Sequence, residues 1–308
     1  MKLKIRNKRE AVFCWGYLCR EFNEFTELPN DLNSAKDKIL ITLESYQIKT
    51  GEIIEDDIIS KCSESLLTDN EIVWINDNDD RLINWLWYTI KSYTSIYNLL
   101  HDITKKNYYP MPESIRQKNN SNMEDILDKF NLNKSPSSII EKKDIIIKYF
   151  DLLFLPKTEK IKIFNIFKEK WETIKSFDTF NWLEDKNNNY SEWALNYLDT
   201  YKSNKPYSFP NINDFSIESD KLKFILLFDI WKVPSDTKKL FLQSMKKALY
   251  QKKFRDKQVD KKQCSFNLSE DIIKKLSFLS NIKDKQKNKI LEELILKEYK
   301  KETENFIV

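Results

Sequence analysis

The chain has 308 residues, of which 41% are hydrophobic and 13% aromatic, enough to bury a sizeable core in one or more domains. Two glycines and one histidine argue against phosphate loops, dinucleotide-binding turns and histidine-based metal or catalytic sites. The net charge of +4 conceals an asymmetry, because residues 232–301 contain 20 Lys and Arg against 9 Asp and Glu, and the remainder contains 32 against 39. A basic segment on an acidic body indicates a polyanion-binding surface.

Residues 1–70 are predicted to form an N-terminal helical region. The stretches "REAVFCWGYLCREFNEF" and "DLNSAKDKILITLESYQIKTG" both show helical spacing of apolar residues. Asp31 or Asn33 is expected to cap the second helix, with Gly51 at its C-terminal end. The basic start precedes no long apolar run, and no window approaches a membrane span, so the expected compartment is the cytoplasm.

The cysteines give no sign of a metal or redox site. Cys14, Cys19, Cys62 and Cys264 match no metal-ligand spacing. We expect buried thiols in a reducing compartment. The sequence therefore predicts no metal, no cofactor and no small-molecule substrate.

Residues 71–250 contain a degenerate tandem repeat, with copies at about 74–171 and 182–250. The stretches "WINDNDDRLINWLWYTIKSY" and "WLEDKNNNYSEWALNYLDTY" align without a gap. Their helical spacing of apolar residues favours core helices over base-stacking aromatics. The matching aromatic pairs are Trp74 with Trp182, Trp85 with Trp193, and Tyr93 with Tyr201.

A second pair of matching stretches, "FDLLFLPKTEK" and "FDIWKVPSDTK", follows these. In each, a helix is expected to end near the Phe-Asp pair, and Pro156 or Pro234 to open the next helix. Asp151 and Asp229 could form a carboxylate pair for acid-base chemistry, but their equivalent places in two repeats favour a shared cap or turn role. The body is therefore predicted to be all-α.

The hydrophobic pattern of residues 251–308 differs from that of the helical body. In "QCSFNL", apolar Cys264, Phe266 and Leu268 alternate with polar residues, which indicates a short strand with one buried face. Ser269 then begins a helix, and "KNKILEELILKEYKK" forms a second. A lone strand and two short helices cannot form a core alone, so we expect the strand to pair with that of a second chain.

This arrangement resembles the ribbon-helix-helix family of DNA-binding proteins, which includes the Arc and MetJ repressors, and most closely the C-terminal domain of MatP. The resemblance covers roughly residues 252–301. It implies a homodimer whose two strands form an antiparallel ribbon, with the polar face of that ribbon in the DNA major groove. The family usually has glycine in the turn between the helices and Ser or Thr as the second cap, where this chain has Asp284 and Gln286. Asp tolerates a left-handed turn.

The resemblance assigns roles by position. Gln263, Ser265 and Asn267 would contact base edges. The predicted phosphate contacts are Lys252, Lys253, Arg255, Lys257, Lys261, Lys262, Lys285, Gln286, Lys287 and Asn288. The predicted dimer core is Phe266, Leu268, Leu276, Leu279, Leu291 and Leu294.

The sequence thus predicts a cytoplasmic, nucleoid-associated homodimer that binds double-stranded DNA, as a transcriptional regulator or a chromosome organiser, and is not an enzyme. The helical body would contact other proteins or set the spacing of bound dimers. An alternative is a helical interaction scaffold, such as a mobile-element or phage-defence accessory, whose C-terminus only dimerises. A further alternative, a nuclease using Asp151 and Asp229, is expected to fail a metal-dependent nuclease assay.

Overall fold

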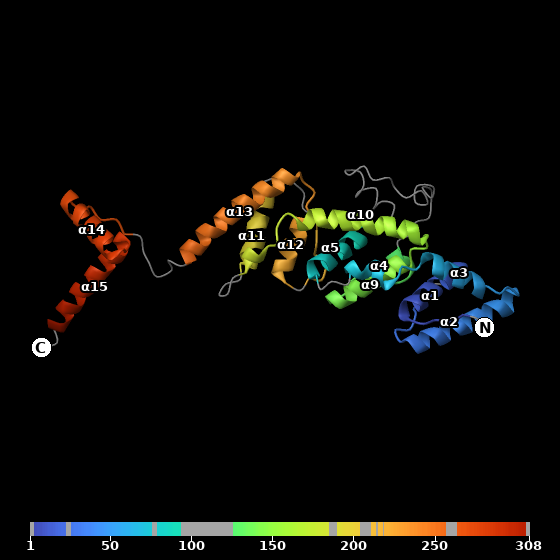
Figure 1. Ribbon diagram of the computed structural model, residues 1–308. Coiled ribbons are helices and arrows are strands. Elements are labelled where there is room, and N and C mark those ends of the chain that lie inside the picture. The colour runs from blue at the N-terminus through green and yellow to red at the C-terminus, as the bar shows by residue number, and fades with distance from the viewer. Residues whose placement is uncertain are drawn as a thin grey trace. The chain divides into compact units, whose positions relative to one another are not determined.

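A computed structural model (Figure 1) describes residues 3–22, 26–75, 79–93, 126–184, 190–203, 211–213, 215–217, 219–256 and 264–305. Within these ranges the chain is helical and no strand is assigned, which confirms the prediction of a mainly α-helical protein. The chain separates into two compact units, residues 1–245 and 246–308, which we describe one at a time.

The first unit begins with three helices, α1 (Lys8–Phe22), α2 (Leu32–Thr50) and α3 (Glu55–Ser65). Asp31 caps α2 as predicted, because its Oδ1 accepts a hydrogen bond from the Ser34 N–H at 2.8 Å. Gly51 ends the same helix with φ of 73°, a left-handed conformation that costs glycine little. Both predicted ends of this helix are therefore confirmed.

Among the described residues, the middle of the unit carries three short and three longer helical segments. Their bounds are α4 (Asp69–Ile72), η1 (Val73–Ile75), α5 (Asp80–Lys91), α8 (Ile126–Lys129), α9 (Ile139–Asp151) and α10 (Lys157–Lys175). Pro156 precedes α10, and its carbonyl accepts from the Lys160 N–H, as expected of a proline that opens a helix.

The last part of the unit contains η2 (Asn181–Leu183), α11 (Ser191–Ser203), α12 (Asp220–Ile230) and the start of α13 (Ser235–Asp256). Pro234 precedes α13, with its carbonyl bonded to the Thr237 N–H at 3.0 Å. The two prolines therefore open two helices in the same way.

Helices that are neighbours in space come from distant parts of the sequence. Helix α1 packs against α9, α9 against α5, α5 against α12, and α12 against α11. Helices that carry the Trp-rich stretches thus alternate with helices that end at Phe150-Asp151 and Phe228-Asp229. The cores follow this order: one lies among α1, α2 and α3, one around α5, α9 and α10, and one among α11, α12 and α13.

Residues 1–70 share one compact unit with the rest of the body. Helix α1 packs on α9, and α3 packs on α10. The side chain of Ser65, at the end of α3, donates a buried hydrogen bond of 2.8 Å to the Leu155 carbonyl. Helices α1 and α3 of the predicted N-terminal helical region therefore pack directly on helices of residues 71–250.

The second unit contains the end of α13, then α14 (Glu270–Lys283) and α15 (Lys287–Asn305), which pack on each other. Ser269 precedes α14, and Glu270 and Asp271 lie in its first turn, where acidic groups favour the helix dipole. Residues 264–268 are non-helical.

Candidate functional site

The turn between α14 and α15 is set by Asp284. This residue has φ of 48°, in the left-handed region, and its N–H bonds to the Ser280 carbonyl. The Lys285 N–H shares that carbonyl at 3.2 Å, and the Ser280 hydroxyl donates to the Lys285 carbonyl at 2.6 Å. The expectation that aspartate adopts the left-handed conformation here is confirmed.

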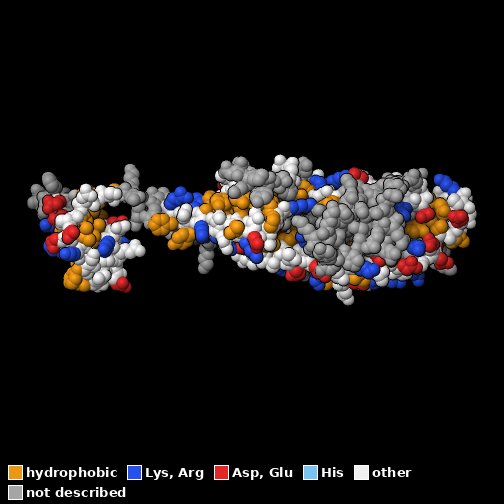
Figure 2. Space-filling model, turned by 90° about the horizontal axis from the view of Figure 1, so that it is seen from above, with side chains coloured by type: hydrophobic (Ala, Val, Ile, Leu, Met, Phe, Trp, Pro, Cys, Tyr) orange, Lys and Arg blue, Asp and Glu red, His pale blue; other side chains and the backbone are white. Residues whose placement is uncertain are grey.

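The α14–α15 pair buries little of its apolar surface within one chain. Leu276 is 8% exposed and Ile290 is fully buried, so these two side chains carry the contact between the helices. Phe266 is 72% exposed. Figure 2 shows hydrophobic side chains at the surface of this unit. The other exposed apolar residues are Leu268, Ile272, Ile273, Phe278, Ile282, Leu294, Ile295, Leu296 and Tyr299.

The six residues predicted as dimer core divide into two groups. Leu276, Leu279 and Leu291 are buried or half-buried between α14 and α15 of one chain. Phe266, Leu268 and Leu294 are exposed.

Two of the three predicted base-reading residues, Ser265 and Asn267, are exposed in the non-helical segment before α14. Gln263 lies outside the described residues. A strand is defined by hydrogen bonds to a neighbouring strand, so the ribbon stays a prediction.

The predicted phosphate contacts fall at two places in the second unit. Lys252, Lys253 and Arg255 lie in the last turns of α13, where Lys252 pairs with Asp256 at 3.2 Å. Lys287 and Asn288 begin α15, whose first turn exposes its free amides. Lys257, Lys261 and Lys262 lie outside the described residues.

Lys285 is already engaged within the chain. Its Nζ lies 2.5 Å from Glu293 Oε1, and Lys283 lies 3.9 Å from the same carboxylate. The hydrogen bond from Lys285 lowers the pKa of Glu293. A phosphate at this end of α15 would compete with Glu293 for Lys285. Gln286 precedes α15 and its backbone carbonyl accepts from the Ile290 N–H.

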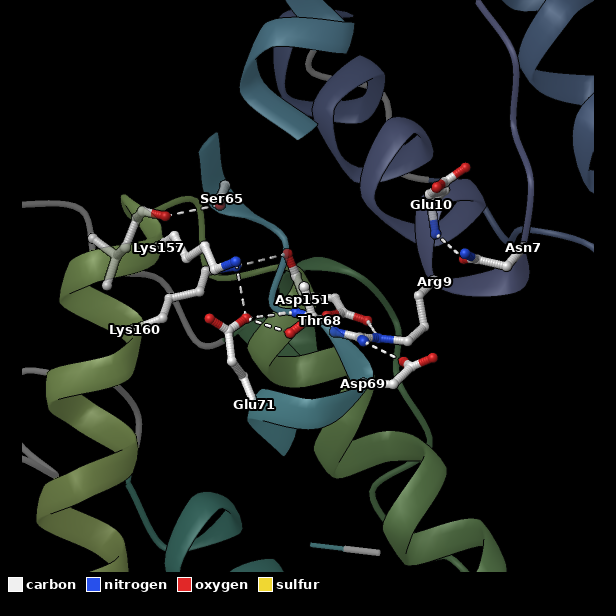
Figure 3. Close-up of polar contacts among 11 residues, drawn as sticks. Asn7, Arg9, Glu10, Ser65, Thr68, Asp69, Glu71, Asp151, Lys157 and Lys160 are labelled. Atoms are coloured by element: carbon white, nitrogen blue, oxygen red, sulfur yellow. Dashed lines mark hydrogen bonds and ion pairs between the residues drawn. The ribbon is translucent and has the colours of Figure 1, made fainter. Parts of the chain in front are cut away.

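In the first unit, Asp151 belongs to an ion cluster that joins four helices (Figure 3). Both oxygens of its carboxylate bind the Arg9 guanidinium, at 2.9 Å from Nε and 2.6 Å from Nη2. Arg9 Nη1 donates to Asp69 Oδ1 at 3.0 Å. Lys160, fully buried on α10, directs its ammonium group toward the Asp151 carbonyl at 3.4 Å. The cluster thus ties α1 and α10 to the end of α9.

Asp229 lies in a second cluster built from the same residue types. Its carboxylate binds Arg81 on α5, at 2.8 Å from Nε and 2.7 Å from Nη2. Lys238 on α13 donates to the Phe228 and Asp229 carbonyls at 2.7 and 3.1 Å. An ammonium group at a helix C-terminus binds the last carbonyls and is favoured by the helix dipole.

The clusters give a structural role to Asp151 and Asp229, the two aspartates at equivalent places in the predicted repeat. The sequence predicts a shared cap or turn role for these aspartates, whereas each carboxylate binds an arginine from a helix far away in sequence. Burial raises the pKa of Asp151 and of Asp229, and the guanidinium bonded to each opposes that rise. Burial also lowers the pKa of Lys160 to about 7. Because the carboxylate oxygens are occupied by arginine, the arrangement serves to hold helices together.

The sequence contained a signal for these arginines that the repeat alignment did not use. Arg9 precedes Trp15 by six residues, and Arg81 precedes Trp87 by six. Helix α1 therefore carries the same Arg-to-Trp spacing as α5, although it lies outside the two predicted copies.

The thiols differ in their surroundings. Cys14 and Cys19 are buried as expected. Cys62 is half-buried and Cys264 is exposed, so the prediction of buried thiols is met only in part for Cys62 and is wrong for Cys264. A hydrogen bond between the Cys14 and Cys62 side chains lowers the pKa of Cys62 and raises the pKa of Cys14.

Within the described ranges, no group of three or more His, Cys, Asp and Glu side chains is placed to hold a metal ion. In the same part of the chain, no helix has the length and hydropathy needed to cross a bilayer. In comparisons with known proteins, no family model, curated protein or solved structure matches the chain. The ribbon-helix-helix resemblance thus rests on the sequence pattern.

Proposed function

We propose that the protein is a homodimer that binds double-stranded DNA through residues 246–308. The observation that carries this proposal is the uncovered apolar surface of the α14–α15 pair beside a lysine-rich chain segment. Phe266 is 72% exposed, and Ile282 and Ile295 are 65% and 63% exposed, although α14 and α15 themselves are packed. Such exposure on a small helical unit marks an association surface.

A second copy of the same segment is the occupant that best satisfies this surface. Among the described residues, none forms a backbone hydrogen bond with residues 264–268. Pairing with the equivalent segment of another chain would satisfy those groups and cover Phe266 and Leu268 together. A ribbon of this kind also places Ser265 and Asn267 on the face opposite the apolar residues.

The charge of the segment favours DNA as the ligand of the dimer. Residues 232–301 carry 20 Lys and Arg against 9 Asp and Glu. The exposed amides at the start of α15 are suited to a phosphate, and Lys287 lies beside them. Phosphate contacts from α13 and α15 would orient the ribbon, and its amide and hydroxyl side chains would contact base edges in the major groove.

We also propose that the first unit is a tandem duplication that supports the DNA-binding unit and contacts other proteins. The two Arg–Asp–Lys clusters support it, because they repeat the same three contacts at the ends of α9 and α12. The process served would be transcriptional regulation or DNA organisation at the nucleoid.

The test is binding of the full-length protein to duplexes selected from a random library, followed by fluorescence anisotropy at several salt concentrations. We expect a palindromic site and an affinity that falls steeply with salt, since several phosphates are neutralised per subunit. The variant Ser265→Ala/Asn267→Ala should reduce the preference for the selected site over a scrambled duplex by at least tenfold.

The matched control is Asn33→Ala/Ser34→Ala, which removes the same two side-chain types at exposed positions on α2. An unchanged site preference in Ser265→Ala/Asn267→Ala would show that the ribbon does not read bases. A dimer that binds no duplex at low salt would replace the proposal by the interaction scaffold.

A further inference from the structure

The two ion clusters differ in what covers their guanidinium groups. The Arg81 guanidinium lies 5.5 Å from the ring centroid of Trp171 and 5.0 Å from that of Phe180. Its Nη1 donates to the Asp178 carbonyl at 2.7 Å. The second cluster is therefore closed by aromatic rings and by the backbone that follows α10.

The first cluster has a different cover. The sequence offset of 108 that aligns Trp74 with Trp182 also aligns Ser63, on α3, with Trp171, on α10. Ser63 is exposed, and Arg9 Nη1 donates to Asp69, whose side chain is 89% exposed. A serine thus stands where the second cluster has an indole ring.

A cavity of about 460 Å³ occupies this place, lined by Arg9 and Ser63 and by apolar Ile59 and Leu66. Cavities of this size bind small organic molecules. Its charged lining residues are Lys4, Arg6, Arg9 and Lys157 against Glu10 and Asp69. Arg9 is paired with Asp69 and Asp151, and Lys157 with Glu71, which leaves Lys4 and Arg6 against Glu10 at the rim. A ring entering beside Arg9 would meet the guanidinium as Trp171 meets Arg81.

We propose that this cavity binds a small aromatic anion of the nucleoside monophosphate class. The base would lie against the Arg9 guanidinium, in the place that the Trp171 indole takes at Arg81, because arginine stacks well on aromatic faces. The phosphate would lie by Lys4 and Arg6, which are exposed at the rim. This assigns a small ligand to a chain whose sequence indicated none, and it does not depend on DNA binding.

The test is isothermal titration of the full-length protein with adenosine monophosphate, and in separate arms with adenosine and with inorganic phosphate. We expect the nucleotide to bind at least tenfold more tightly than either component, because ring and phosphate use different walls of the cavity. Binding of phosphate as tight as that of the nucleotide would overturn the assigned role of the ring, and no nucleotide binding at millimolar concentration would overturn the proposal.

Two tryptophan variants locate the site. Ser63→Trp supplies the ring that the second cluster already has, and is expected to weaken nucleotide binding at least tenfold. Ser60→Trp adds the same ring on the same helix, at an exposed position that does not line the cavity, and should bind as wild type. Equal affinity of the two variants would contradict the proposal.

Lys4→Ala/Arg6→Ala provides the deciding measurement if circular dichroism shows that Ser63→Trp is unfolded. Both side chains are exposed, so the fold should tolerate their removal. The variant is expected to lose at least fivefold in affinity for the nucleotide and to leave the affinity for adenosine unchanged. An unchanged nucleotide affinity would overturn the proposal.

Discussion

Each arginine in the two clusters binds a carboxylate that is almost inaccessible to water. Asp151 is 1% exposed and Asp229 is 5% exposed. Removal of one partner of a buried ion pair typically costs about 3–5 kcal/mol, because the other charge stays buried and alone. The two buried pairs therefore contribute strongly to holding together helices that are distant in sequence.

We predict that Arg81→Met lowers the free energy of unfolding by about 3–5 kcal/mol. Arg9→Met should cost less, because Arg81 also binds the Asp178 carbonyl and contacts two rings, whereas the further contact of Arg9 is to the exposed Asp69. The measurement is urea denaturation followed by tryptophan fluorescence. Arg81→Met/Asp229→Leu, which also removes the buried carboxylate that Arg81 neutralises, should regain much of the loss, and a double variant no more stable than the single one would contradict this account.

Lys160 predicts a pH dependence of stability. Burial lowers its pKa to about 7 in the folded protein, whereas the value in an unfolded chain is about 10.4. Between these values the unfolded chain binds the additional proton, so stability rises with pH in this window. The free energy of unfolding of the wild type, relative to Lys160→Met, should therefore increase from pH 6 to pH 9.

Urea denaturation at pH 6, 7.5 and 9 measures this difference. The control is Lys168→Met, which replaces an exposed lysine on the same helix and should give a difference independent of pH. The same pH dependence in both variants would show that Lys160 is not its source.

At the scale of elements, α14 and α15 carry both a contact within the chain and the surface that we propose for a second chain. Ile290 is fully buried between the helices, whereas Leu294, one turn further along α15, is 44% exposed. Of these two residues, only Ile290 would be buried in a monomer. In the proposed dimer, both residues would be buried.

We predict that Ile290→Ala destabilises the second unit by about 2–5 kcal/mol, as expected for a buried aliphatic truncation. Leu294→Ala should leave α-helical content unchanged and weaken self-association at least tenfold. Circular dichroism measures the helical content and its loss on unfolding, and sedimentation equilibrium measures self-association. Wild-type association of Leu294→Ala would place the dimer surface elsewhere.

Elements with local causes could be predicted from the sequence. The cap at Asp31, the left-handed ends at Gly51 and Asp284, and the helices opened by Pro156 and Pro234 each depend on a few neighbouring residues. Backbone sterics and hydrogen bonding within one turn decide them.

The ion clusters could not be predicted in the same way. Arg9 lies 142 residues from Asp151, and Arg81 lies 148 residues from Asp229. Nothing local to Asp151 shows which cation neutralises it, so the sequence suggested a cap. The cavity beside Arg9 was hidden for the same reason, because it depends on which helices become neighbours.

At the scale of the whole molecule, the chain is divided into two units whose stabilities have different sources. The first contains three hydrophobic clusters, while the second leaves much of its apolar surface exposed in a single chain. A unit completed by a second copy is stabilised by mass action, so its stability depends on protein concentration.

We predict two transitions in differential scanning calorimetry of the full-length protein. The transition of the second unit should shift upward by several degrees when the concentration is raised a hundredfold, and that of the first unit should not move. Leu294→Ala should reduce the concentration dependence. Two transitions that are both independent of concentration would exclude a dimer formed through residues 246–308.

The long sequence separation of the arginine–carboxylate pairs has a consequence for synthesis of the chain. Arg9 leaves the ribosome well before Asp151, and at roughly 5–20 residues per second the delay is on the order of ten seconds. Another 148 residues are synthesised between Arg81 and Asp229, so the delays for the two pairs overlap. During the overlap, α1 and α5 present their aromatic faces without α9 or α12. We therefore expect the nascent chain to expose these apolar helices until the second half of the protein has been made.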